Sequence, residues 1–376
     1  MIDARRAGMA DSMPITRRTA AAAAVTARQL REQARSCAAM GSPLYAHLLD
    51  AAADDCAAGG PTWTVLRGRA ASGRGDALAL RLMAAVHRLV LERRAPELAL
   101  HYPSVGGSGA IEGAWPAFRA ALEHRADEVT VLVGRRCQTN EVGRSAALAV
   151  GFVEVTRATG LPLRLLEVGA SAGLNLRCDR FRIGGGGAVL GDPTSPVDLS
   201  THWRTPPPSC PARLAVDDRR GCDRAPVDPT TPDGRTTLTA AVWADQRDRL
   251  ARLRGALRIA AQVPVEVDRA SLDGWTRQQL AALPTGVATV VFHSVVEEYV
   301  DDATRERFVA TLDDAGRRAT PGAPLAWVRV EPVSQLRHHE VQATLWPGGR
   351  PRTLARCGAH GTAVEWLGDD KSAARR

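Results

Sequence analysis

Apolar residues recur at helical spacing through the first third of the chain. Ala, Leu and Val alternate with charged residues over 19–58, and the same pattern returns from Asp76 to Arg94. A spacing of three and four residues places apolar side chains on one face of a helix. The sequence therefore predicts a helical region over 19–126, preceded by a mobile tail at 1–18.

The pattern changes after residue 127 to short apolar runs separated by amphipathic stretches, although Val129–Val133 fits a strand or a helix. Such runs are typical of strands covered on both faces. The predicted strands are 163–168, 213–217, 263–267, 288–294 and 325–330, and the predicted helices are 143–158, one from about 172, 239–260, 275–282 and 303–318. This alternation predicts an α/β domain with a Rossmann-like, doubly wound, mostly parallel sheet.

Two further segments complete the organisation of this domain, which we place at 127–368 before a tail at 369–376. Residues 184–211 contain four consecutive glycines and Pro206-Pro207-Pro208, a composition that predicts an irregular insertion. Near the end, 341–346 and 353–366 flank a Pro-Gly-Gly turn and predict an antiparallel hairpin.

Composition excludes several classes of protein. The longest apolar runs are far shorter than the roughly 20 residues of a membrane-spanning helix. Arg17 and Arg18 precede the apolar run 20–25, but Arg28 and later charges interrupt it, which argues against an export signal. The seven cysteines are odd in number and contain no Cys-x-x-Cys, so we expect reduced thiols and a cytoplasmic protein.

The net charge of +8 raises the question of acidic partners. The arginines are spread among acidic residues, without a sustained basic run or interleaved aromatics, so nucleic-acid binding is not indicated. His338-His339-Glu340 lacks the His-Glu-x-x-His spacing, and we predict no metal.

The turn after the strand 163–168 carries the main candidate chemistry. Glu167, Gly169, Ser171 and Gly173 resemble the Glu-x-Gly-x-Gly-x-Gly signature of class I S-adenosylmethionine methyltransferases, with serine at the middle glycine. Residues 169–173 also match the Gly-x-Ser-x-Gly motif of the nucleophile elbow in α/β-hydrolases. The same five residues therefore leave two chemistries open.

The methyltransferase reading assigns a cofactor site. Backbone N–H groups of the turn would approach the methionine part of S-adenosylmethionine, while Glu167 would orient its amino-acid end. Asp223 would bind the ribose, Asp268 would contact adenine, and Asn175 joins the same set, although both acids also fit ordinary turn positions. Parallel strands closed by a hairpin are also what the class I methyltransferase fold has, and we favour this reading.

The hydrolase reading takes Ser171 as nucleophile, with Asp301 or Asp302 as the acid and His360 as the base. This preserves the order serine, acid, histidine along the chain. The sequence lacks a His-Gly-Gly-Gly oxyanion motif, and its last two predicted strands form a hairpin where a hydrolase sheet would continue in parallel.

A second candidate cluster follows the strand 288–294. His293, at the tip of that strand, fits either a general base or a structural histidine, and Glu297 and Tyr299 complete the predicted catalytic set. Gln138, Asn140 and Glu141 precede the first strand and are predicted to bind substrate, although a capped helix start also explains them. The Asp/Asn-Pro-Pro-Tyr motif of amino-methyltransferases is absent, so a non-catalytic module that binds an adenosyl ligand stays open.

Motifs of this kind extend over most of the chain. They are QTNEVGR at 138–144, LLEVGASAGLNL at 165–176, RRGCDRAPVD at 219–228, VFHSVVEEY at 291–299, PLAWVRVEP at 324–332 and LWPGG at 345–349. Together they resemble the family called domain of unknown function 2332, and the resemblance implies a methyltransferase-like domain behind a helical region. We expect transfer from S-adenosylmethionine to a small-molecule acceptor. The sequence leaves the acceptor and the oligomeric state open.

Overall fold

The chain divides into a helical unit and an α/β unit. A computed structural model describes residues 15–69, 77–184, 190–205, 214–333 and 338–368. The helical unit takes the chain up to Cys137 together with 239–247, and the α/β unit takes 138–238 and 248–376. The division therefore falls ten residues or so beyond the expected 127, and a short later segment returns to the helical unit.

The helical unit is built as its apolar periodicity predicts. Its helices are α1 (Ile15–Ala39), α2 (Pro43–Ala57), α3 (Pro61–Leu66), α4 (Leu78–Leu91), α5 (Pro96–Ala99), α6 (Ala114–His124) and α7 (Ala126–Val133). Helix α1 begins inside the expected tail, whose residues 1–14 lie outside the described ranges. Buried Leu48, Leu82, Leu89 and Phe118 belong to one apolar core, whose removal from water stabilises the unit.

The α/β unit contains an eight-stranded, mostly parallel sheet in the order β10-β9-β8-β7-β6-β1-β4-β5. Its strands are β1 (Leu163–Val168), β4 (Val216–Asp223), β5 (Glu266–Arg269), β6 (Ala288–Ser294), β7 (Leu325–Pro332), β8 (His339–Trp346), β9 (Arg350–Cys357) and β10 (Glu365–Trp366). The strands β5, β4, β1, β6 and β7 pair in parallel. The chain adds β4 and β5 on one side of β1, and β6 and β7 on the other. The predicted parallel core is therefore confirmed.

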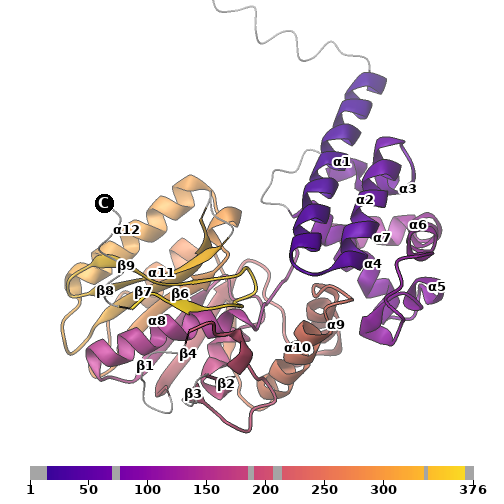
Figure 1. Cartoon of the computed structure of the whole chain (residues 1–376). Coiled ribbons are helices and arrows are strands. Elements are labelled where there is room, and N and C mark those ends of the chain that lie inside the picture. The colour runs from indigo at the N-terminus through magenta and orange to yellow at the C-terminus, as the bar shows by residue number, and fades with distance from the viewer. Residues whose placement is uncertain (1–14, 70–76, 185–189, 206–213, 334–337, 369–376) are drawn as a thin grey trace, which may run out of the picture. The chain divides into compact units, whose positions relative to one another are not determined.

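Helices cover both faces of this sheet (Figure 1). On one face, α8 (Arg144–Thr159) packs Phe152 edge-on against Phe292 of β6, with ring centroids 5.0 Å apart. On the other face, α11 (Leu272–Gln279) and α12 (Asp302–Arg318) bury Trp275 and Phe308 with Leu166 of β1. Strand alternation sends neighbouring side chains into these two separate layers.

The C-terminal edge contains the expected hairpin and extends it on both sides. Strand β8 pairs antiparallel with β7, β9 with β8, and β10 with β9, so these strands form a meander added in chain order. The hairpin itself is present, but the strand order points to an arrangement other than the expected methyltransferase-like sheet. What is established is a mixed α/β unit with a mostly parallel sheet.

Several predicted elements have different bounds. The strand expected at 213–217 is β4 at 216–223, and the helix expected from about 172 is a short 3₁₀ helix, η4 (Asn175–Arg180). Inside the predicted insertion, the described residues include β3 (Leu190–Gly191), which pairs with β2 (Arg182–Ile183), while 185–189 and 206–213 lie outside the described residues.

The helix expected over 239–260 is divided into α9 (Pro232–Ala240) and α10 (Arg247–Ala260). The residues between them belong to the helical unit, where the Asp245 carboxylate accepts hydrogen bonds from Ser42 Oγ at 2.6 Å and from the Leu44 amide at 3.1 Å. The side chain of Gln246 donates to the Met40 carbonyl at 2.8 Å. These tertiary contacts end the helical run that the apolar pattern alone would continue.

Candidate functional site

The candidate site lies at the carboxyl ends of β1, β4, β6 and β7. In open parallel sheets, ligands bind outside the carboxyl ends of the strands, at the point where the strand order reverses. That point lies here between β1 and β6. Most of the side chains singled out from the sequence lie at or near this edge, but their contacts differ from those expected.

The turn after β1 adopts the conformation its glycines suggest. Gly169, Ser171 and Gly173 have φ values of 69°, 54° and 63°. Glycine adopts this left-handed region without steric cost, whereas it is uncommon for serine. A left-handed serine next to a buried strand end indicates a strained local geometry that the surrounding contacts must hold.

Those contacts occupy every backbone donor from Ala170 to Leu174. The acceptors are the Cys222 carbonyl, the Asp223 carboxylate, the Ala170 carbonyl and, for two amides, the side-chain oxygen of Asn140. The two Asn140 bonds, from the Ala172 and Leu174 amides, measure 3.2 and 3.0 Å. The amides predicted to hold a cofactor are thus bonded to protein acceptors in this conformation.

Asn140 and Asp223 therefore brace the turn. The Asp223 carboxylate accepts from the Ser171 amide at 2.9 Å and from the Ala225 amide at 2.8 Å, linking the ends of β1 and β4. Protein side chains also fill the space beside the turn glycines. A Cβ added to Gly169 would lie 2.6 Å from Val296 Cγ2, and one added to Gly173 would lie 3.0 Å from Val267 Cγ2.

Two polar atoms at the turn have no hydrogen-bond partner among the described residues: Glu167 Oε2 and Ser171 Oγ, both buried. Glu167 is 3% exposed, and burial raises its pKa well above the usual range, against the lowering effect of Asn175. Asn175 in turn accepts from Ser145 Oγ at 2.8 Å. Buried polar groups are ordinarily paired, so these atoms are the unusual feature of the turn.

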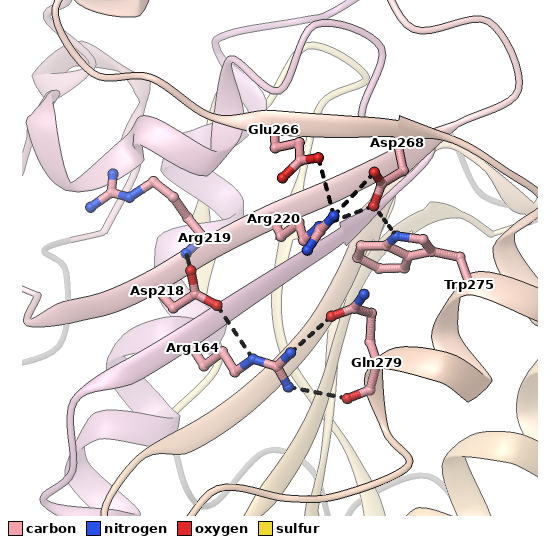
Figure 2. Close-up of polar contacts among 8 residues, drawn as sticks. All are labelled: Arg164, Asp218, Arg219, Arg220, Glu266, Asp268, Trp275 and Gln279. Carbon is pink, nitrogen blue, oxygen red and sulfur yellow. Dashed lines mark hydrogen bonds and ion pairs between the residues drawn. The ribbon is translucent and has the colours of Figure 1, made fainter.

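Asp268, the predicted adenine contact, belongs to a different layer. It is in register with Cys222, one position before Asp223, so the two carboxylates extend from opposite faces of the sheet. Asp268 accepts from Arg220 at 3.0 and 3.2 Å and from Trp275 Nε1 at 2.6 Å. The Arg220 hydrogen bond lowers the pKa of Asp268. Figure 2 shows this network, in which Arg164 also links Asp218 to Gln279.

His293 is held in one tautomer. The indole N–H of Trp327 donates to His293 Nε2 at 3.0 Å, so Nε2 carries no proton. His293 Nδ1 lies 2.7 Å from Glu331 Oε1 and donates to it, and the same oxygen accepts from the Val296 amide at 2.9 Å. Both ring nitrogens of the predicted general base are therefore engaged. Trp327 and Glu331 lie in the sequence motif PLAWVRVEP, but no function was predicted for them from the sequence.

A small hollow opens beside His293. Its walls are mostly apolar, with polar groups from a few residues. The residues that line it are Val168, Leu272, His293, Val296, Glu297, Val300, Arg305, Phe308, Val309, Trp327 and Arg329. Glu297 pairs with Arg329 at 3.1 Å, and the Arg329 guanidinium lies 4.3 Å from the Trp327 ring centroid. Tyr299, the third predicted catalytic residue, is 43% exposed and is not among these wall residues. Apolar hollows with a few convergent polar groups are typical of small-molecule sites.

Glu141 is buried in an ion pair and is closed to substrate in this conformation. Its Oε2 lies 2.6 Å from Arg249 Nη2, and its Oε1 accepts from the Gly143 amide at 3.0 Å. Burial alone would raise the pKa of Glu141, but Arg249, His360 and Arg144 outweigh it and lower the pKa to about 2. Gln138, from the same predicted substrate set, is also buried.

The hydrolase arrangement is not assembled. Ser171 Oγ has no hydrogen-bond partner within the described ranges, whereas a serine nucleophile needs an adjacent base. His360 acts instead on the pKa of Glu141, and Asp301 caps α12 by accepting from the Thr304 amide at 2.8 Å. Asp302 pairs with Arg305 at 2.7 Å on the surface.

Fold and site together define a mixed α/β protein with a candidate ligand site at the switch point of its sheet. A family model described as "Uncharacterized protein conserved in bacteria (DUF2332)" matches residues 27–366, so the chain belongs to this family. No curated protein and no solved structure matches the chain. Within the described ranges, none of the helices combines the length and the apolar character needed to cross a membrane.

Proposed function

We propose that the α/β unit is an S-adenosylmethionine-dependent methyltransferase that acts on a small-molecule acceptor. The observation that carries this proposal is the pair of buried, unpartnered atoms Glu167 Oε2 and Ser171 Oγ, at a left-handed turn where the strand order reverses. A ligand that brings hydrogen-bond donors to these atoms removes the desolvation cost of leaving them unpaired. An amino-acid ammonium group is such a donor.

The fit of the cofactor to this conformation is partial. Glu167 and Ser171 suit its amino-acid end, but the turn amides are bonded to Asn140 and Asp223, and Asp268 is bonded to Arg220 and Trp275. Binding through the amides therefore requires Asn140 to release them. The cofactor would supply the methyl group. The chain's own contribution is to hold an acceptor in the apolar hollow, where positioning supplies most of the rate.

A second candidate is a module that binds an adenosyl ligand without transfer. The observation that favours it is the engagement of His293, whose Nδ1 and Nε2 are both in hydrogen bonds with Glu331 and Trp327. A general base needs a free lone pair directed at the acceptor. In the module, His293 is a structural link between β6 and β7 instead.

Titration calorimetry with S-adenosylmethionine and with its demethylated product tests both candidates. We expect binding to the full chain, weakened at least tenfold by Glu167→Gln, because a bound ammonium group favours the carboxylate form of Glu167 and pairs with it, and an amide has no such form. Asn140→Ala should bind more tightly than the native chain, since it frees the Ala172 and Leu174 amides. Asp302→Asn, at an exposed ion pair, is the control that should change nothing.

The outcomes separate the candidates. No binding of either compound at millimolar concentration would exclude the methyltransferase and the module together. Binding followed by methyl transfer to a cell-extract fraction supports the enzyme, and binding without transfer to any fraction supports the module. Unchanged affinity in Glu167→Gln would show that the turn is not the cofactor site.

A further inference from the structure

A cluster of arginines surrounds the first residues of α8. Arg144 is the first residue of the helix, and Arg249 and Arg252 lie three residues apart on one face of α10. The Arg249 and Glu141 side chains, 6% and 3% exposed, form the ion pair described above. Arg144 donates from Nε to the Ala359 carbonyl at 2.9 Å and from Nη1 to the Ser294 carbonyl at 3.4 Å. The cluster therefore lies next to the carboxyl end of β6.

Close packing brings two histidines to the same place. A Cβ added to Gly143 would collide with the His360 carbonyl and would lie 2.8 Å from His202 Cε1 and 3.1 Å from Glu141 Oε1. His202 Nδ1 donates to the Gly361 carbonyl at 2.9 Å, because a carbonyl oxygen only accepts. The loop 358–361 and His202 thus form a wall around the start of α8.

The carboxylate buried in this cluster is that of Glu141, and three guanidinium groups act on it. The other acids that act on Arg144 and Arg252 are Glu331, which is bonded to His293 and Val296, and Asp248, which is exposed. Arg252 Nε is buried and has no hydrogen-bond partner among the described residues. The positive end of the α8 dipole lies at the same place.

The pKa values of both histidines are lowered by the nearby arginines as well as by burial. Burial, and after it Arg249, lowers the pKa of His360 to about 3. Burial and then Arg252 lower the pKa of His202. Guanidinium groups that are partly withdrawn from water gain from a further counter-charge, and their planar shape lets them bind carboxylate and phosphate oxygens in pairs.

We propose that Arg144, Arg249 and Arg252 form an oxyanion site that binds the carboxylate or phosphate group of a small molecule at the start of α8. The site stands on its own contacts and does not depend on methyl transfer. Arg252 contributes the unpartnered donor, Arg144 and Arg249 are fixed by their bonds to backbone and to Glu141, and the neutral histidines form the walls.

Calorimetry and thermal unfolding of the full chain with inorganic phosphate, succinate or chloride at equal ionic strength test this site. We expect phosphate or succinate to raise Tm and chloride to have no such effect, and the stronger of the two identifies the anion. Arg252→Gln should weaken that binding at least tenfold. Arg258→Gln removes the same charge from an exposed position of α10 and should bind like the native chain.

Two further measurements make the result decisive. In NMR titrations, the bound anion should raise the pKa of His360, because a nearby negative charge favours the imidazolium form. Arg252→Lys, checked for folding by circular dichroism, should bind less tightly than the native chain but more tightly than Arg252→Gln. Equal effects of all three salts, or equal binding by Arg252→Gln and Arg258→Gln, would overturn the proposal. No experiment here uses S-adenosylmethionine, so failure of the proposed function leaves this test intact.

Discussion

The two units of the chain differ in how they group their buried polar side chains. In the helical unit, His87 is fully buried, accepts from Ser104 Oγ through Nε2 at 2.8 Å and donates from Nδ1 to the Ala240 carbonyl at 3.2 Å. Its aromatic neighbours Tyr45 and Tyr102 are also fully buried. This cluster is neutral, because burial lowers the pKa of His87 to about 4.

The α/β unit gathers ionisable side chains at one edge of its sheet, most of them buried. Glu141 with Arg249, Glu167, and Glu331 with His293 all lie near the carboxyl ends of β1, β6 and β7. Burying ionisable groups is costly, and groups with perturbed pKa values gather at functional sites. The comparison therefore favours the α/β unit as the location of the proposed chemistry, while the His87 cluster is neutral.

The largest expected effect comes from the buried ion pair. Glu141→Gln leaves the Arg249 guanidinium buried without its counter-charge, which should lower the free energy of unfolding of the α/β unit by about 3–5 kcal/mol. Urea unfolding, followed through hydrogen exchange of the β1 and β6 amides, measures the loss. Asp302→Asn breaks an exposed pair and should cost about 0–1 kcal/mol. Equal losses in the two variants would remove the contrast between buried and exposed charge.

The next effect is a pH dependence of the helical unit. His87 has a folded pKa of about 4 against an ordinary 6.5, so the unfolded chain binds the proton more readily. The contribution is fully present above pH 6.5 and falls as the pH drops towards 4, by about 3 kcal/mol in total. Urea unfolding of the helical unit at several pH values should show this slope.

The matched variants are His87→Gln, which should remove that slope, and His124→Gln on the exposed surface of α6, which should keep it. A slope that survives in His87→Gln would place the titrating group elsewhere. In the α/β unit, His360 has a folded pKa of about 3, so the corresponding loss also begins below pH 6.5 but continues to lower pH. The α/β unit should therefore still be losing stability from this group below pH 4, where the contribution of His87 has levelled off.

The smallest effect concerns strain at the edge that carries the site. Val295 has a φ of 56°, a genuine outlier for a β-branched residue, immediately after β6. Val295→Gly should raise the free energy of unfolding by about 1 kcal/mol, because glycine adopts this conformation without strain. Val300→Gly, at a φ of −114°, should lower it instead. Thermal unfolding of both variants measures the difference, and destabilisation by Val295→Gly would show that its side-chain packing outweighs the strain.

Local sequence patterns were reliable where burial alone decides structure. The strands predicted at 163–168 and 288–294 have the observed bounds, because a run of apolar residues covered on both faces leaves little freedom in placing the element. The prediction of one continuous helix over 239–260 was wrong, because contacts of Asp245 with Ser42, 203 residues away in the sequence, interrupt it. No local pattern carries that information.

Sequence patterns were limited in the same way at the candidate site. Ser171, Asp223 and Asn140 lie close together in the structure, because the turn after β1 and the end of β4 meet at one edge of the sheet. Their bonding was not predictable, because a motif states which residues follow one another and not which donor meets which acceptor. The roles of Trp327 and Glu331 depend on the pairing of β6 with β7.

The sequence by itself determined the helical first third, the parallel α/β core, the glycine turn after β1 and membership of the family. Tertiary structure alone decided that Asn140 and Asp223 fill the turn, that Asp268 faces α11, and that three arginines gather at the start of α8. The physical reason is that periodicity records which side chains avoid water. Hydrogen bonds and ion pairs form between groups that only the folded chain brings together.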